Sequence, residues 1–81
     1  MEPLHSYVLV NVEVGAESRI LNQLRNVPEV VEAWSVYGVY DLVVKIKAEN
    51  PEKLKQIVIE RIRKIDGVRS TLTLIPIEGF Q

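Results

Sequence analysis

The sequence contains no cysteine, one histidine and four glycines in 81 residues, and each of these shortages excludes a class of site. Without cysteine, the chain can form neither a disulfide framework nor a thiolate metal site. The single histidine, His5, has no second ligand at the spacing of a transition-metal site. The glycines match neither a dinucleotide-binding nor a phosphate-binding loop, and no serine follows a nucleophile motif. We therefore expect no enzyme activity, no catalytic residue, no metal and no cofactor.

Neither sign of charge dominates, and long hydrophobic runs are missing. Ten Lys and Arg residues oppose eleven Asp and Glu residues, which gives a net charge of −1. Nucleic-acid-binding domains are usually basic, so we expect no direct DNA binding. No apolar run approaches the roughly 18 residues that span a bilayer, and the N-terminus lacks the features of a signal peptide. The composition favours a cytoplasmic protein without membrane contact.

The chain is short, yet 47% of its residues are hydrophobic. A chain of this size forms one domain and buries only about 60–65% of its unfolded surface. Apolar side chains in excess of a small core remain at the surface, where a large apolar patch is unusual for a monomer. We therefore expect a second subunit to cover part of this surface.

Residues 30–47, VVEAWSVYGVYDLVVKIK, predict a β-hairpin. Gly38-Val39 has the composition of a two-residue type II′ loop in which Gly38 carries the positive φ. This register segregates the side chains, and a slip of one residue would exchange the two faces. The face toward the core holds Val31, Ala33, Ser35, Tyr37, Tyr40, Leu42, Val44 and Ile46. The other face holds Glu32, Trp34, Val36, Asp41, Val43 and Lys45.

Strand and helix signals alternate along the rest of the chain. Strict alternation predicts strands over residues 7–14 and 68–75, with Val8, Val10, Val12 and Val14 buried in the first. Helical spacing predicts helices over residues 17–27 and 51–65, the second capped by Asn50 and followed by Gly67. This order predicts an α+β, ferredoxin-like βαββαβ fold: an antiparallel four-stranded sheet with both helices on one face.

The sheet face away from the helices is predicted to be open and apolar. We expect an oligomer interface there, formed by Tyr7, Leu9, Trp34, Val36, Val43 and Ile75. The same registers place Asn11, Asp41, Lys45, Thr71 and Thr73 on this face. RNA binding is a poor alternative, because the strand at 42–48 offers no aromatic ring on which a base could stack.

Polar groups around the hairpin tip favour a small-molecule site. Asp41 offers a carboxylate for a ligand ammonium, and Gly38 and Tyr40 expose backbone groups. Thr71 and Thr73 offer hydroxyls from the last strand. From spacing alone two interpretations stay open, because Asp41 either binds a ligand or only caps the turn.

Two segments, YGVYDLVVKI and IDGVRSTLTLI, resemble the effector domain, or RAM domain, of the Lrp/AsnC family of transcriptional regulators. The resemblance covers about residues 7–76. It is carried by a Gly-x-Tyr-Asp turn, by a Pro-x-Val after the first helix and by a Ser-Thr-x-Thr in the last strand. These motifs correspond here to Gly38, Tyr40 and Asp41, to Pro28 and Val30, and to Ser70, Thr71 and Thr73. The x position of the turn, often acidic or polar in the family, is Val39.

The resemblance implies an amino-acid-binding regulatory and oligomerisation module. In the family, the domain dimerises through its sheet, the dimers assemble further, for example into a ring, and an amino-acid effector binds near the turn between dimers. The family's helix-turn-helix has no counterpart before Tyr7, so residues 1–81 resemble a single stand-alone effector domain. Its expected partners are an effector, other copies and full-length family regulators. Two alternatives stay open: a small dimeric α+β barrel enzyme and a purely structural assembly module.

Overall fold

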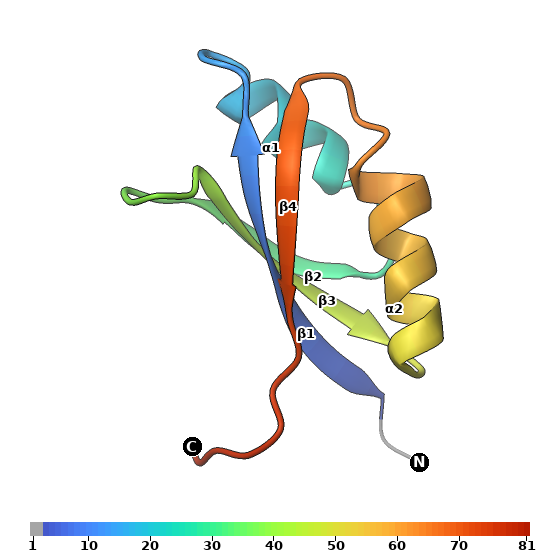
Figure 1. Ribbon diagram of the computed structural model, residues 1–81. Coiled ribbons are helices and arrows are strands. Elements are labelled where there is room, and N and C mark those ends of the chain that lie inside the picture. Colours follow the sequence, from blue (N-terminus) through green and yellow to red (C-terminus); the bar gives the residue numbers. More distant parts are fainter. Residues whose placement is uncertain (1–2) are drawn as a thin grey trace.

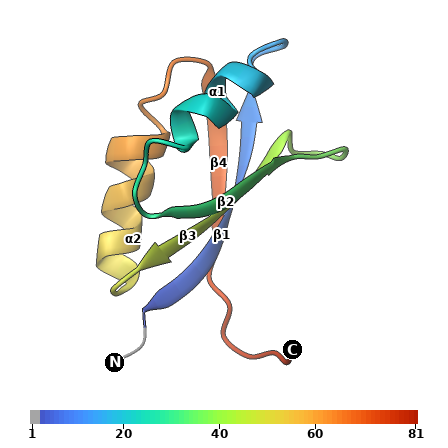
Figure 2. The same ribbon diagram turned by 180° about the vertical axis from the view of Figure 1, so that it is seen from behind.

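A computed structural model describes residues 3–81 and contains one antiparallel sheet with its helices on one side (Figure 1). The elements are β1 (Leu4–Val12), α1 (Glu17–Leu24), β2 (Val30–Ser35), β3 (Leu42–Ala48), α2 (Pro51–Ile57), the π-helix η1 (Val58–Ile62) and β4 (Val68–Leu74). The four strands lie in the order β2-β3-β1-β4. The view from behind shows α1 and α2 against the same face of the sheet (Figure 2). The predicted ferredoxin-like fold is confirmed.

The central strand β1 fills the core with alternate valines. Val8, Val10 and Val12 are buried as predicted, and they pack with Leu42, Val44 and Ile46 of β3. Val14 is fully exposed, because the strand ends at Val12. The strand also begins earlier than predicted, at Leu4, because Leu4 and Ser6 pair with Ala48 and Ile46 at the far end of β3. Pairing with a distant strand thus extends β1 beyond its alternating segment.

The helical layer covers this core with the predicted apolar stripes. Ile20 and Leu24 of α1, together with Leu54 and Ile57 of α2, are buried. The second helix does not stay α-helical to residue 65, because η1 continues it as a π-helix in which the Arg63 N–H donates to the Val58 carbonyl (2.8 Å). Both Val58 and Ile62 remain buried in this wider turn. Single π-helical turns of this kind are rare and are frequent at functional sites.

The β2–β3 hairpin confirms the predicted register only in its middle. Pairs from Ser35–Leu42 to Glu32–Lys45 form as predicted, but a bulge follows, and Val30 rather than Val31 pairs with Ile46. Val31 is therefore exposed, where we predicted a core residue, and Tyr37, predicted on the same face, is fully exposed in the loop after β2. The predicted two-residue turn is also wrong. Residues 36–41 form a loop, and the φ of Gly38 is 151°, far from the roughly 60° of a type II′ turn.

The predicted faces of β4 are wrong. Thr73 and Thr71 pair with Val8 and Val10, whose side chains are buried on the helix side. Side chains of directly paired residues point to the same face of a sheet. Thr71 and Thr73 therefore lie on the helix side, and the open face instead carries Ser70, Leu72 and Leu74. Ile75 follows the end of β4 and Val36 follows the end of β2, so neither is part of the sheet.

Candidate functional site

Asp41 ends the hairpin loop and is bonded to the central strand. Its backbone N–H donates to the Val10 carbonyl (3.0 Å). Its Oδ2 accepts a hydrogen bond from the backbone N–H of Val12 (2.8 Å). The two bonds hold Asp41 at the end of the β1–β3 pairing, which explains why the loop is wider than a two-residue turn. The carboxylate still has capacity for further donors, since it can accept up to about four hydrogen bonds.

A polar depression of about 390 Å³ lies beside this carboxylate. It is lined by Asn11 and Val12 of β1, by Asp41, and by Arg69 and Ser70 of β4. The Asn11 Nδ2 donates to the Ser70 Oγ across the two strands (3.4 Å). The pairing of β1 with β4 is irregular between Asn11 and Val12, and such bulges often occur next to functional sites. The residues that line the depression therefore carry a carboxylate, a guanidinium, a hydroxyl and an amide.

The structure brings only one of the predicted ligand-binding side chains to this depression. Asp41 lines it, whereas Thr71 and Thr73 lie on the other face of the sheet. Gly38 and Tyr40 belong to the loop that leads to Asp41. Within one chain these predicted site residues therefore do not converge on a single ligand.

Apart from Asp41, the residues that line the depression were not among the predicted ligand-binding residues, and two of them, Arg69 and Ser70, lie in β4. Ser70 belongs to the same Ser-Thr-x-Thr segment as the two threonines, and Arg69 precedes it. The correct register of β4 against β1 is the signal that identifies them, because Asn11 pairs with Ser70. The alternation of apolar and polar residues along β4 alone does not show which of its residues lie beside Asn11.

The open face of the sheet is the second candidate surface. Tyr7, Leu9, Trp34 and Val43 lie on it as predicted, and Leu72 and Leu74 join them. Trp34 is 61% exposed. Its Nε1 donates to the Glu32 Oε2 (2.7 Å), and the Lys45 Nζ lies 6.0 Å from the centroid of the Tyr7 ring. An exposed apolar patch with polar residues at its edge is typical of a protein-interaction surface.

The described part of the chain contains neither a metal-ligand cluster nor a membrane-spanning helix. Residues 3–81 contain no group of three or more His, Asp or Glu side chains that could hold a metal ion. None of the helices in this range is long and apolar enough to cross a membrane.

Comparison with known proteins identifies the family. The family model of the Lrp/AsnC ligand binding domain matches residues 6–80. The HTH-type transcriptional regulator FL11 of Pyrococcus horikoshii is 39% identical over 70 residues, which are 86% of this chain and 46% of the regulator. Escherichia coli AsnC superposes with a TM-score of 0.88 at 25% identity, over 94% of this chain and 52% of the AsnC chain.

One similar protein is an enzyme. Homocitrate synthase of Sulfurisphaera tokodaii is 46% identical over 63 residues, which are 78% of this chain and 13% of the enzyme. The first regulators that the chain matches are about twice its length, since it spans about half of each. The match to the family model covers nearly the whole sequence. The chain therefore belongs to the Lrp/AsnC family and forms the ligand-binding domain of that family.

Proposed function

We propose that this chain is a regulatory effector domain that binds an α-amino acid and acts through its assembly with other copies. The observation that carries the proposal is that one depression is lined by both an acidic residue, Asp41, and a basic residue, Arg69. An α-amino acid at neutral pH presents an ammonium and a carboxylate. Charge-assisted hydrogen bonds from these two groups to Asp41 and Arg69 would be the strong contacts.

The neighbouring polar groups fit the same ligand. The Ser70 hydroxyl and the Asn11 amide both donate and accept hydrogen bonds, and each lines the depression. Gly38 and Tyr40 would contribute backbone groups from the loop that ends at Asp41. Thr71 and Thr73, on the other face of β4, would reach only an effector held by an adjacent copy. This geometry favours a binding site that lies between copies of the chain.

Assembly is the second half of the proposal. We infer that the open face, with Leu9 at its centre between Val43 and Leu72, packs against a second copy. Dimers would then associate further and bring the hairpin loops of neighbouring dimers together. The module would act in the cytoplasm and assemble with full-length regulators of the family, which would contact the DNA.

The match to homocitrate synthase covers 13% of that enzyme, whereas the first two regulator matches each cover 46% of the regulator. The larger shares support regulation rather than catalysis as the role that we propose for the domain. No observation in residues 3–81 favours the alternative of a small barrel enzyme over an effector domain.

The test of the proposed function is Asp41→Asn, which keeps the shape of the side chain and removes its charge. An amide oxygen can still accept from the Val12 N–H, so the loop should hold. Losing a hydrogen bond between charged groups costs roughly 1.5–3 kcal/mol, and we therefore expect about tenfold to hundredfold weaker binding. The measurement is calorimetry of all twenty amino acids against the wild type, then of the binder against the variant.

Asp66→Asn is the matched control, because Asp66 is exposed and lies outside the depression. It should bind as the wild type does. Sedimentation equilibrium on every variant checks that the assembly is unchanged. If Asp41→Asn binds as tightly as the wild type at unchanged mass, then Asp41 only anchors the loop and the proposed site is wrong.

A further inference from the structure

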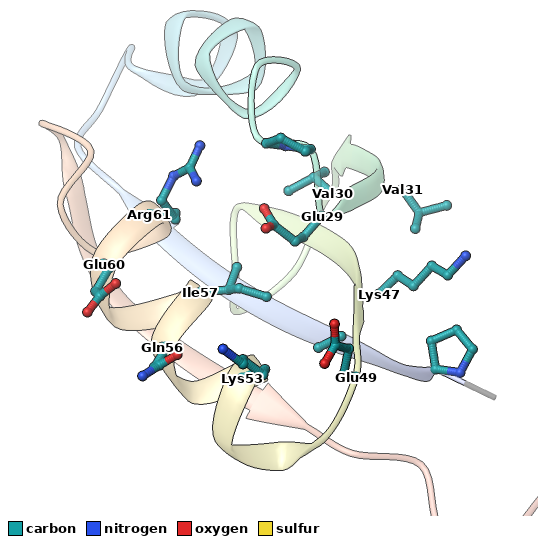
Figure 3. Close-up of a pocket in the computed structure, with 13 residues that line it drawn as sticks. Glu29, Val30, Val31, Lys47, Glu49, Lys53, Gln56, Ile57, Glu60 and Arg61 are labelled. Atoms are coloured by element: carbon teal, nitrogen blue, oxygen red, sulfur yellow. The ribbon is translucent and has the colours of Figure 1, made fainter. Parts of the chain in front are cut away.

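A second cavity lies away from Asp41. Its volume is about 560 Å³, and it opens between the second helix and the edge where β2 begins and β3 ends (Figure 3). One wall is formed by Lys53, Ile57 and Arg61 of α2 and η1, and the other by residues 28–31 and 47–49. We call this cavity the α2 groove. It shares no residue with the depression at Asp41.

One side-chain atom of a residue that lines the α2 groove lacks a partner that its chemistry requires. The Glu29 Oε1 is buried and has no hydrogen-bond partner. Among residues 3–81 the only comparable side-chain atom is the Ser6 Oγ, which lies in the core and lines no cavity. A buried carboxylate oxygen without a donor is costly, so such an atom indicates a missing partner. The Glu29 side chain points toward the side of the groove that the helix forms (Figure 3).

The backbone fixes Glu29 at this place. The Lys47 N–H donates to the Glu29 carbonyl (2.9 Å), and the Val30 N–H donates to the Val27 carbonyl (3.0 Å). Pro28 lies directly before Glu29, and its ring fixes its own φ. Glu29 therefore belongs to an ordered segment just before β2. The Glu29 Oε1 cannot gain a hydrogen bond by a backbone shift unless these backbone bonds break.

The cations that line the groove do not supply the missing donor. Lys53 and Arg61 line the same cavity, but neither is hydrogen-bonded to the Glu29 Oε1. Lys47 extends away from Glu29 (Figure 3). Beside the carboxylate, Ile57 and Val30 form an apolar surface. A ligand that fits both features carries a hydrogen-bond-donating cation on a short hydrocarbon chain.

We propose that the α2 groove is a second binding site, which takes a small aliphatic primary amine. The ammonium donates to the Glu29 carboxylate, and Glu49 adds a second negative charge to the lining of the groove. The hydrocarbon chain covers Ile57 and Val30. The π-helical turn η1, which places Arg61 on the wall and keeps Ile62 in the core, shapes the far end. This site does not depend on the proposed amino-acid site.

The experiment is a ligand-observed NMR titration of the full chain with n-butylammonium, which supplies the ammonium and the chain. n-Butanol and n-butyrate are the neutral and anionic probes of the same length. We expect butylammonium to bind, and Glu29→Gln to weaken it about tenfold to hundredfold, because an amide loses the charge-assisted bond. Butanol and butyrate should bind at least tenfold more weakly than butylammonium.

Glu60→Gln is the matched control, because Glu60 also lines the groove but points away from Glu29 (Figure 3). It should change the affinity less than twofold. Asp41→Asn tests whether the amine binds in the depression at Asp41 instead. If Asp41→Asn abolishes binding while Glu29→Gln does not, the amine occupies the other depression, and the inference is wrong while the proposed function stands.

Two further outcomes would overturn the inference. If butylammonium does not bind at millimolar concentrations, or if butanol binds equally well, water alone satisfies the Glu29 carboxylate. If Glu29→Gln lowers the mass in sedimentation equilibrium, the donor is a side chain of a neighbouring copy, and the groove is a contact between copies. Binding with the expected order of probes and variants, at unchanged mass, supports the site.

Discussion

At the scale of one residue, the conformation of Gly67 depends both on its own backbone and on contacts with α1, which is distant in the sequence. Its φ is 100°, a conformation that residues with a Cβ rarely adopt. A Cβ built at Gly67 would lie 2.7 Å from the Arg19 Nη2 and 3.2 Å from the Ile20 Cδ1. The same arginine donates from Nη1 to the Asp66 carbonyl (2.8 Å). The turn before β4 is therefore packed against α1.

Gly67→Ala should destabilise the protein by about 1–3 kcal/mol, because the left-handed backbone and the close contact with Arg19 both oppose a methyl group. The measurement is the free energy of unfolding in urea. Gly79→Ala is the control, because a Cβ at Gly79 would meet nothing within 4 Å. Equal stability of the two variants would show that the turn tolerates a side chain and that our account of Gly67 is wrong.

The sequence predicted part of each of these residue-level features. The Asp-Gly pair at 66–67 predicts a turn with a glycine at positive φ, and the structure confirms it. The contact with Arg19 could not be predicted, because it joins segments far apart in the chain. Asp41 was likewise predicted next to the hairpin tip, but its bond to the Val12 N–H depends on how β1 and β3 end. The buried oxygen of Glu29 has no sequence signal at all.

At the scale of elements, the start of α2 is the clearest local structure in the chain. The Asn50 Oδ1 accepts a hydrogen bond from the Lys53 N–H (2.9 Å), Pro51 occupies the first turn, and Glu52 lies at the positive end of the helix dipole. Each of these preferences is local. The helix start was therefore predicted to the residue.

Asn50→Ala should cost about 1 kcal/mol, with a range of roughly 0.5–2 kcal/mol, because a backbone N–H of the first turn loses its acceptor. Thermal and urea unfolding both measure this change. Asn22→Ala serves for comparison, since Asn22 is exposed within α1 and alanine favours a helix interior. A loss at Asn50 no larger than the change at Asn22 would contradict the capping role.

The elements that were predicted wrongly all depend on a partner segment. Alternation separated Thr71 and Thr73 from Leu72 and Leu74, but only the pairing of β4 with β1 decides which set faces the helices. The bulge that exposes Val31 arises between β2 and β3. The π-helix η1 preserves the predicted apolar stripe, so the stripe cannot distinguish it from an α-helix.

For the whole molecule, the open face is the feature with the largest consequence for assembly. Leu9 lies at its centre, flanked by Val43 on one neighbouring strand and Leu72 on the other. Apolar residues that remain exposed around them include Trp34, Leu72 and Leu74. If a second copy covers this face, these side chains form a core shared by two sheets.

Leu9→Lys should weaken this association, because it would bury a charge in the shared core. Losses at the centre of an interface often reach about 2 kcal/mol or more, which is about thirtyfold in affinity. Sedimentation equilibrium over a range of concentrations measures the effect. Ile59→Lys is the control, because Ile59 is an exposed apolar residue in the helical layer. A monomeric wild type, or an unchanged mass for Leu9→Lys, would contradict the role of this face.

Because β1 pairs with both β3 and β4, the sheet can form completely only after β4 is present. Tyr7 pairs with Leu74 and Asn11 with Ser70, so β1, the first strand of the domain, keeps one edge unpaired until β4 has been synthesised. Such distant pairings make folding slow, because a long loop must close before the contacts form. The depression between Asn11, Asp41 and Ser70 exists only after this closure. A chain that lacks β4 therefore lacks this depression, and under the proposed function it would not respond to an effector until β4 is in place.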